Sequence, residues 1–163
     1  MVVYSNHAID LQQLDLGYLA LFLGQRVNEL VVQRLLRGGF KQVRQSHGYV
    51  IQHLIESDRS ISDLARRMGV TQQAASKTVA EMIRLGLLEA ESAQDRRAKV
   101  IRISSRGWES IRFSRKARIQ LERRLQTLLG TSKHRDLKAG LIKCLAELGG
   151  IQKIRARRVR EPQ

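Results

Sequence analysis

The side chains best suited to binding chemistry in this sequence are polar and basic groups on one predicted helix, residues 72–85. Gln72 and Gln73 stand at its start, where a side-chain amide can pair bidentately with adenine in the major groove of DNA. The candidate contacts on this helix and its cap are Thr71, Gln72, Gln73, Ser76, Lys77 and Arg84. In isolation such residues more often form a solvated helix face, so the neighbouring segments must decide between the two interpretations.

A second group of candidate residues lies between two predicted strands, residues 87–91 and 99–103. The basic members of this group are Arg96, Arg97 and Lys99. An arginine at the tip of a hairpin can enter the minor groove of DNA, attracted by its negative potential. Asp95 is unfavourable beside a polyanion, so we expect it to orient an arginine through a carboxylate–guanidinium pair.

Two short helices joined by a glycine turn must position these residues. We expect Ser62 to cap a helix over residues 63–68, Gly69 to supply the turn, and Thr71 to cap the next helix. The buried stripe of that second helix is predicted to be Ala75, Val79 and Met82, which leaves the polar candidates on the opposite face. Helix, turn, helix and hairpin together form the outline of a winged helix, which favours DNA binding over a solvated face.

The composition supports an anionic partner. The chain of 163 residues has 30 Lys+Arg against 15 Asp+Glu, a net charge of +15. Such an excess favours nucleic acid or an anionic membrane surface, although a merely basic protein remains an open alternative. Aromatic residues are only 4% of the chain, which disfavours a β-sandwich and a single-strand binder that stacks bases.

Several kinds of chemistry find no support. Cys144 is the only cysteine, so neither an internal disulfide nor a cysteine-based zinc site is expected. His47 and His53 are six residues apart, whereas metal pairs on a helix sit three or four apart. The sequence has no glycine-rich phosphate loop and no nucleophile–base motif, so we expect neither an enzyme nor a cofactor. Without a membrane span or a secretory signal, the expected location is cytoplasmic.

Helices are predicted on both sides of the winged helix. The first covers residues 10–37 and ends at Gly38-Gly39; its surplus of leucines suggests a second copy of the chain as a partner. Another helix is expected from Ser46, as its N-cap, to residue 56. Two more are expected over residues 106–129, capped by Ser104 or Ser105, and 134–148.

The predicted fold is mainly α with a small β-hairpin wing: a winged helix-turn-helix lobe plus a helical dimerisation lobe. Its parts are residues 8–37 (N-terminal dimerisation helix), 46–104 (DNA-binding lobe), 105–150 (C-terminal dimerisation helices) and 151–163 (basic tail). Cys144 is expected to be a packed core thiol, with redox sensing as the weaker alternative. For Trp108 a core anchor is favoured over the wall of a ligand pocket.

The positive charge is concentrated outside the predicted winged helix. Residues 108–163 carry 15 Lys+Arg and 5 Asp+Glu. Five of the eight residues from 153 to 160 are basic, which fits either an arm that reaches phosphates or a solvated tail, the latter being slightly favoured.

The wing carries the clearest resemblance to a known family. The segment Asp95-Arg96-Arg97-Ala98-Lys99, followed by Ile103-Ser104-Ser105-Arg106-Gly107, resembles the D-x-R-x-K and L-T-x-x-G pattern of MarR (multiple antibiotic resistance regulator) proteins. Residues 46–54 and 63–65 and the Gly86-Leu87-Leu88-Glu89 segment are similar too. Ile103 and Ser104 replace Leu and Thr, and the proline often found in the wing is absent.

This resemblance implies a homodimeric transcription regulator, often a repressor, that binds a pseudo-palindromic operator in double-stranded DNA. It assigns the minor-groove contact to Arg97 and the orienting role to Asp95. It also implies release by a small, often phenolic, ligand bound between the lobes, although no motif marks such a pocket. The alternative function is a low-specificity DNA-coating or anti-silencing protein driven by net positive charge. A winged helix used for protein contacts is disfavoured by the polar, positive face.

Overall fold

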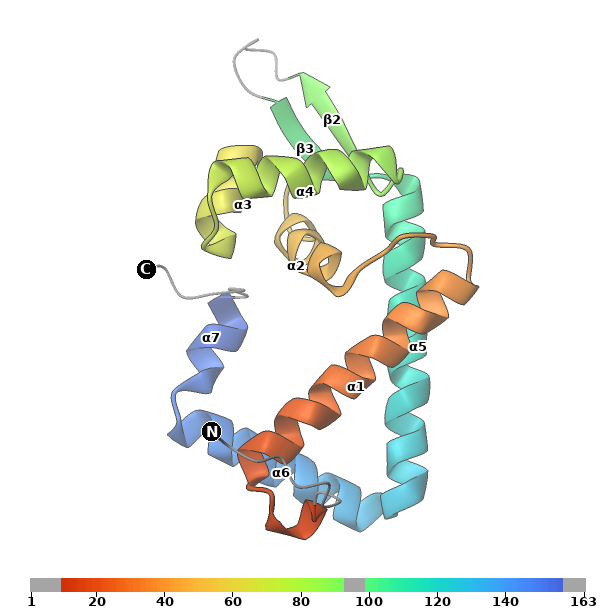
Figure 1. Ribbon diagram of the computed structural model, residues 1–163, viewed down its shortest axis with the longest axis vertical. Helices are drawn as coiled ribbons and strands as arrows, with labels where there is room; N and C mark the ends of the chain where they lie inside the picture. The colour runs from red at the N-terminus through yellow and green to blue at the C-terminus, as the bar shows by residue number, and fades with distance from the viewer. Residues whose placement is uncertain (1–9, 93–98, 157–163) are drawn as a thin grey trace, which may run out of the picture.

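The computed structural model describes residues 10–92 and 99–156, and these form a mostly helical chain with one small sheet (Figure 1). The elements in chain order are a 3-10 turn (Leu11–Gln13), α1 (Leu16–Arg37), α2 (Gln45–Leu54), β1 (Arg59–Ser60), α3 (Ile61–Met68), α4 (Gln72–Arg84), β2 (Leu88–Ser92), β3 (Lys99–Ile103), α5 (Ser105–Leu129), α6 (Thr131–Glu147) and α7 (Gly150–Ala156). The predicted fold class, mainly α with a winged helix-turn-helix, is confirmed.

The start of α1 differs from the sequence-based prediction of one helix from residue 10. The side chain of Asp15 accepts a hydrogen bond from the backbone N–H of Tyr18 at 2.9 Å. Because Asp15 has extended backbone angles and caps the helix, α1 begins at Leu16 and the preceding residues form only a 3-10 turn. The predicted end is correct: Gly38 is the C-cap.

The helix-turn-helix forms as the sequence indicates, with one N-cap shifted. Gly69 has φ +66°, in the left-handed region that glycine adopts without strain, and it ends α3. Thr71 then caps α4 by accepting a hydrogen bond from the N–H of Ala74 at 3.2 Å. The N-cap of α3 is Ser60, not Ser62, because the Ser60 hydroxyl accepts from the N–H of Asp63 at 3.2 Å.

The N-terminus of α2 is also capped differently. The helix begins at Gln45 with Arg44 as its N-cap, so the prediction that Ser46 is the N-cap is wrong. The backbone N–H of Arg44 donates to Nδ1 of His47 at 3.2 Å. A buried histidine in the first turn therefore satisfies a backbone donor that a helix start leaves free.

The wing is part of a three-stranded antiparallel sheet with strand order β1-β3-β2. In the hairpin, Leu88 pairs with Ile103 and Glu89 with Arg102. The third strand, β1, is only two residues long and pairs Arg59 with Ile101. The strand β1 was not predicted from the sequence, because two residues are too few to show an alternating pattern.

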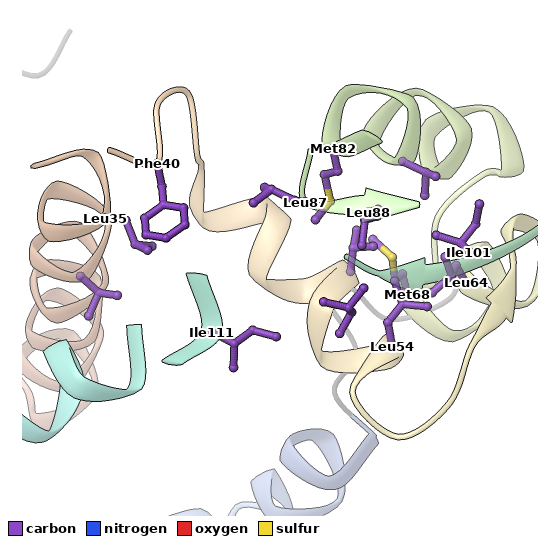
Figure 2. Close-up of a cluster of buried hydrophobic side chains, with 14 of the residues drawn as sticks. Leu35, Phe40, Leu54, Leu64, Met68, Met82, Leu87, Leu88, Ile101 and Ile111 are labelled. Carbon is purple, nitrogen blue, oxygen red and sulfur yellow. The ribbon is translucent and has the colours of Figure 1, made fainter. Parts of the chain in front are cut away.

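The hydrophobic core lies inside the winged helix and extends to the C-terminal half of α1 (Figure 2). Its largest fully buried apolar side chains are Leu64, Met82, Leu87, Leu88, Ile101, Val50 and Val79. Val31, Leu35 and Phe40 continue this cluster toward α5. The core thus fixes α2, α3, α4 and the sheet relative to one another, and so positions the exposed face of α4.

The C-terminal elements are packed less tightly than predicted. Ser104 is the N-cap of α5, with its hydroxyl accepting from the N–H of Gly107 at 2.9 Å. Helix α6 begins at Thr131, three residues before the predicted start, and contains no buried residue. Cys144 is exposed, so its prediction as a packed core thiol is wrong for the single chain. Trp108 is 37% exposed and is not a core anchor either.

The helix α7 was not predicted either, because residues 151–163 were expected to form a tail. Its backbone is helical from Gly150 to Ala156. Across the described residues, no helix is both long and apolar enough to cross a membrane.

Candidate nucleic-acid interface

One face of α4 is exposed and polar along the whole helix. Ala75, Val79 and Met82 are buried and hold the opposite face against the core, as predicted. The exposed residues of this face are Thr71, Gln72, Gln73, Ser76, Lys77, Ala80 and Arg84, with one large apolar side chain, Ile83, which is 37% exposed. Within residues 10–92 and 99–156, no ion pair or side-chain hydrogen bond engages Gln72, Gln73, Ser76, Lys77 or Arg84. The side chains predicted to contact DNA from this helix therefore share one face and are available to a partner.

The small side chains on this face leave the helix slim. Ala74 and Ala80 are exposed alanines between the longer polar groups. A major groove about 12 Å wide admits an α-helix whose projecting side chains are short. The geometry thus suits insertion into a groove better than packing against a protein surface, which would favour larger apolar side chains.

A long-range contact fixes α4 to the start of α2. The carboxylate of Glu81 accepts a hydrogen bond from the Arg44 guanidinium, and its Oε1 lies 3.7 Å from Nε2 of His47. The hydrogen bond from Arg44 lowers the pKa of Glu81. Glu81 and Arg44 were not among the predicted residues, because they are 37 positions apart and neither segment alone shows the contact.

His47 is the buried member of this cluster. Its side chain is 1% exposed, and its Nε2 is buried without a hydrogen-bond partner among the described residues. Because Nδ1 accepts from the N–H of Arg44, the ring proton of the neutral form belongs on Nε2, facing Glu81. Burial lowers the pKa of His47, which keeps the ring neutral near pH 7.

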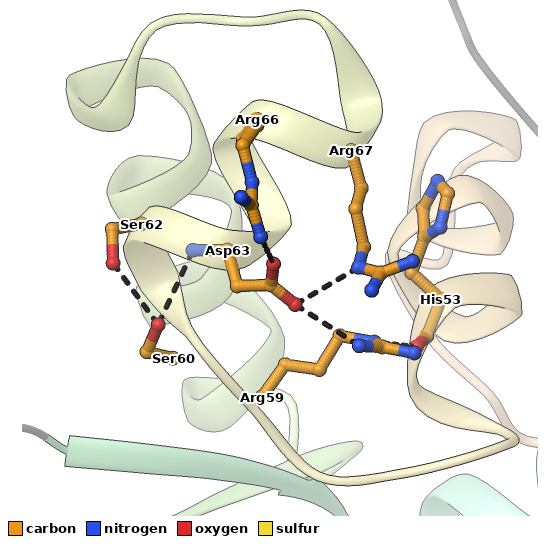
Figure 3. A network of polar contacts seen from close by, with 7 residues as sticks. All are labelled: His53, Arg59, Ser60, Ser62, Asp63, Arg66 and Arg67. Atoms are coloured by element: carbon orange, nitrogen blue, oxygen red, sulfur yellow. Dashed lines mark hydrogen bonds and ion pairs between the residues drawn. The ribbon is translucent and has the colours of Figure 1, made fainter.

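A second polar network holds α3, the first helix of the motif, against β1 and α2 (Figure 3). Asp63 forms ion pairs with Arg66, with Arg67 (Nε to Oδ2, 2.9 Å) and with Arg59 (Nη1 to Oδ2, 3.0 Å). Arg59 also donates through Nε to the carbonyl of His53 at 2.6 Å. The hydrogen bonds from Arg66 and then Arg67 hold the pKa of Asp63 far below its ordinary value. The carboxylate therefore stays ionised and links three elements.

The strands of the wing carry their own ion-pair ladder. Arg102 on β3 donates to Glu89 (Nε to Oε2, 3.1 Å) and to Glu91 (Nη1 to Oε2, 2.7 Å) on β2. These carboxylates, Glu89 first, raise the pKa of Arg102. Lys99 is exposed at the start of β3, as predicted. The predicted wing residues Asp95, Arg96 and Arg97 lie outside the described residues, so their roles stay predictions.

A cavity of about 220 Å³ lies between the winged helix and the long helices. Its apolar wall includes Val31, Leu35 and Ile111, and its polar wall includes Arg44, Arg115 and Arg118. Arg118 donates to Oδ1 of Asn28 at 2.6 Å across this cavity, linking α5 to α1. Trp108, the residue weighed from the sequence as a pocket wall, does not line this cavity, which collects side chains from α1, α2 and α5 that no local motif connects.

An exposed apolar surface covers the N-terminal half of α1 and one side of α6. On α1 its members are Leu16, Tyr18, Leu19, Leu21, Phe22 and Leu23. On α6 and just beyond it they are Leu137, Ile142, Leu145 and Leu148, the last 83% exposed. We call these residues the apolar end surface. Exposed large apolar side chains in such number are typical of an interaction site.

The two histidines of α2 lie in the core. His47 and His53 are both buried, and the described part of the chain contains no group of three or more histidine, cysteine, aspartate or glutamate side chains able to hold a metal ion.

Comparisons with known proteins agree with this geometry. Residues 42–98 match the sequence model described as the MarR family. The fold is similar to MepR, a transcription regulator of the Staphylococcus aureus multidrug efflux pump MepA, with TM-score 0.68, 18% identity, and coverage of 83% of this chain and 99% of that one. It is also similar to E. coli MarR in its apo form (TM-score 0.64, 16% identity, 81% and 97% coverage).

A structure of the S. aureus MepR–DNA complex matches too, with TM-score 0.60, 19% identity, and 83% and 99% coverage. No curated protein sequence matches the chain. The resemblance to the MarR family that the sequence predicts is therefore confirmed, by the family model over the winged helix and by the fold over most of the chain.

Proposed function

We propose that this chain, which carries the winged helix of the MarR family over residues 42–98, binds double-stranded DNA and regulates transcription. In this proposal α4 lies in the major groove, and the wing reaches the adjacent minor groove through Arg97, oriented by Asp95. Thr71, Gln72, Gln73, Ser76, Lys77 and Arg84 contact DNA from α4 and its cap, and Arg96 and Lys99 contact it from the wing.

The observation that carries the proposal is the unpaired polar face of α4. On a helix face with only a structural role, polar groups normally form hydrogen bonds or ion pairs with neighbouring residues, or positive and negative charges alternate. The polar groups of this face are amides, a hydroxyl and cations, with no carboxylate among them. Gln72 and Gln73 lie in its first turn, where recognition helices contact base edges. The neighbouring acidic residue, Glu81, is turned toward Arg44 on α2. A polyanion with base edges matches this pattern.

We further propose that the active species is a homodimer that binds a pseudo-palindromic operator. The apolar end surface supports this, since α6 buries no residue in the single chain and the N-terminal half of α1 exposes six large apolar side chains. In a two-fold dimer the same surface of both copies meets, so the apolar end surface of each copy would be buried. The two recognition helices would then meet half-sites about 34 Å apart, one turn of B-DNA.

The proposal includes repression relieved by a small ligand. The cavity of about 220 Å³ supports it, because it lies where α1 and α5 meet α2, beside the Arg44–Glu81 contact. Its arginines would attract the acidic group of a phenolic or aromatic acid, and its apolar wall would contact the ring. A ligand that engaged Arg44 would weaken its bond to Glu81 and so shift α4 against α2.

The test is selection of bound duplexes from a random library or a fragmented genome, followed by affinity measurement at one fixed salt concentration. Sequence-specific regulation predicts a recovered motif with two-fold symmetry and binding at least about 10³-fold tighter than to random duplex. Addition of salicylate-like aromatic acids should lower the affinity if the cavity is the ligand site. A dimer-disrupting variant should lose the two-fold motif.

The alternative, low-specificity DNA coating, is favoured by the concentration of charge in residues 108–163, with 15 Lys+Arg against 5 Asp+Glu. It predicts no recovered motif and a ratio near one between selected and random duplexes. That result would reject the operator-binding proposal while retaining DNA binding. Absence of binding to any duplex would reject both.

A further inference from the structure

The outward side of α5 carries Arg112, Lys116 and Arg123, which the proposed function does not use, and Arg115, which also lines the cavity of about 220 Å³. The buried positions of this helix are Gly107, Ser110, Ile111, Ala117 and Leu121. Arg112, Lys116 and Arg123 are spaced by four and seven residues, so they share one face, and that face is turned away from the buried positions. Arg115 flanks it. We call Arg112, Arg115, Lys116 and Arg123 the basic face of α5.

The cations of the basic face have no internal partners. All four are exposed, and none forms an ion pair or side-chain hydrogen bond with another described residue. The nearby carboxylate of Glu122 is already engaged, with His134 at 3.3 Å and Lys138 at 3.4 Å. Like charges three and four residues apart destabilise a helix. A bound polyanion would remove this repulsion.

The basic face is unsuited to the homodimer interface. A two-fold interface places the same patch of both copies together, and this would oppose four cations of each copy with few carboxylates, such as Glu109, to pair them. The apolar end surface offers apolar area without that penalty. The basic face therefore stays exposed to solvent when the end surface is covered by a second copy.

We propose that the basic face of α5 is a second, sequence-independent DNA-binding surface, which holds a duplex segment other than the one that α4 contacts. Helix α5 begins beside the sheet and runs away from α4 (Figure 1). At 1.5 Å per residue the row from Arg112 to Arg123 is roughly 16 Å long. That length of duplex carries about ten phosphate charges, so several phosphates lie within reach of the row.

An anionic membrane surface is the other partner with suitable charge, and the face fits it less well. Surface-binding helices insert a continuous apolar side between their cations. On this face the exposed apolar residues are Trp108 and Ile119, which are separated along the helix and do not form a continuous apolar side. A regular row of cations with little apolar area matches phosphates along a duplex better than a lipid interface.

The experiment is a bridging assay with the full chain. The protein is bound to a short random-sequence duplex immobilised on beads, and capture of a second, fluorescent duplex is measured across a salt series. The variant Arg112→Gln/Lys116→Gln/Arg123→Gln should capture the second duplex at least about tenfold less, with a salt slope lower by about 2 to 3, since each phosphate contact contributes about 0.9. Its binding to the first duplex should persist.

A matched control removes the same charge elsewhere: Lys133→Gln/Arg135→Gln/Lys143→Gln on α6, where all three residues are exposed. Equal losses in both variants would show a general charge effect and overturn the proposal, as would unchanged bridging by the α5 variant. The proposal would also be overturned if the α5 variant lost binding to phosphatidylserine-containing vesicles but captured the second duplex normally. Failure of the wild type to bind the first duplex would instead reject the proposed function, which rests on α4 and not on the basic face.

Discussion

The Glu81 carboxylate on α4 accepts a hydrogen bond from the guanidinium of Arg44, the N-cap residue of α2. The same carboxylate oxygen faces the buried ring of His47 at 3.7 Å. The helix proposed to enter the major groove is thus tied at its inner edge to a helix that lines the interlobe cavity. A change at Arg44 or His47 can reach the DNA-contacting face without any contact to DNA.

His47 makes stability pH-dependent. Burial lowers its pKa in the folded chain, so the unfolded chain takes up a proton first as the pH falls below about 6.5. The free energy of unfolding should therefore be full above that pH and decline below it, by at most about 1.4 kcal/mol per pH unit. In His47→Gln, which keeps an acceptor for the N–H of Arg44, this decline should shrink.

Urea unfolding between about pH 7 and pH 5 measures the effect. The control is His134→Gln, because His134 is on α6 and outside the core of the winged helix. If the free energy of unfolding had the same pH dependence in wild type and His47→Gln, His47 would not be the source of the decline.

Asp63→Asn should destabilise the winged helix by about 1 to 2 kcal/mol at neutral pH, because three guanidinium groups lose their shared carboxylate. Since the folded pKa of Asp63 is depressed, this contribution is present above the ordinary aspartate pKa and is lost as the pH falls through the folded value. The two proteins should converge in acid. The control, Asp136→Asn, alters an exposed carboxylate on α6 and should leave stability within about 0.5 kcal/mol. A similar loss in the control would contradict the role of the network.

Gly107→Ala should destabilise the fold by about 1 to 3 kcal/mol or more. A Cβ at Gly107 would lie 2.2 Å from the backbone oxygen of Leu87, and a backbone atom cannot rotate away. The matched control is Gly48→Ala on α2, where a Cβ would meet nothing within 4 Å. Because alanine favours helix over glycine, the control should gain up to about 1 kcal/mol. Thermal unfolding of both variants tests the pair, and equal melting temperatures would disprove the close approach.

Gln73→Ala should relax the preferred base at one position of each half-site, at a cost of about 1 to 3 kcal/mol for the favoured sequence. Lys77→Gln should instead weaken binding to all sequences and lower the salt slope by about 0.9.

Arg97→Ala should weaken binding markedly, through loss of the minor-groove contact. Selected-site affinities at several salt concentrations separate these effects. An unchanged affinity for Arg97→Ala would show that the wing is wrongly assigned.

Phe22→Asp should convert the protein to a monomer, because it places a carboxylate in the apolar end surface. Sedimentation equilibrium measures the molecular mass directly. Ile119→Asp is the matched control, since Ile119 is equally apolar and exposed but lies on the basic face of α5. Dissociation by the control alone would place the dimer contact on α5 instead.

Local signals explain why much of the helix-turn-helix could be predicted. Gly69 ends α3 in the left-handed conformation, and Thr71 caps α4, as their types indicate. The strand from Lys99 to Ile103 has the predicted bounds because Ile101 and Ile103 alternate with outward residues. Other polar residues shifted the remaining boundaries: Ser60 and Arg44 are the N-caps where Ser62 and Ser46 were predicted, and Asp15 caps α1, which was predicted to begin at residue 10.

The sequence by itself determined the order of the main helices and of the hairpin, the exposed polar face of α4 and the family resemblance, since each depends on neighbours in the chain. Only the tertiary structure decided which distant groups meet: Glu81 with Arg44, Arg102 with two glutamates, and β1 with β3. It also decided that Cys144 is exposed, because no residue of α6, the helix that carries it, is buried by the rest of the described chain. Contacts of this kind depend on how the elements pack in three dimensions, which no local pattern encodes.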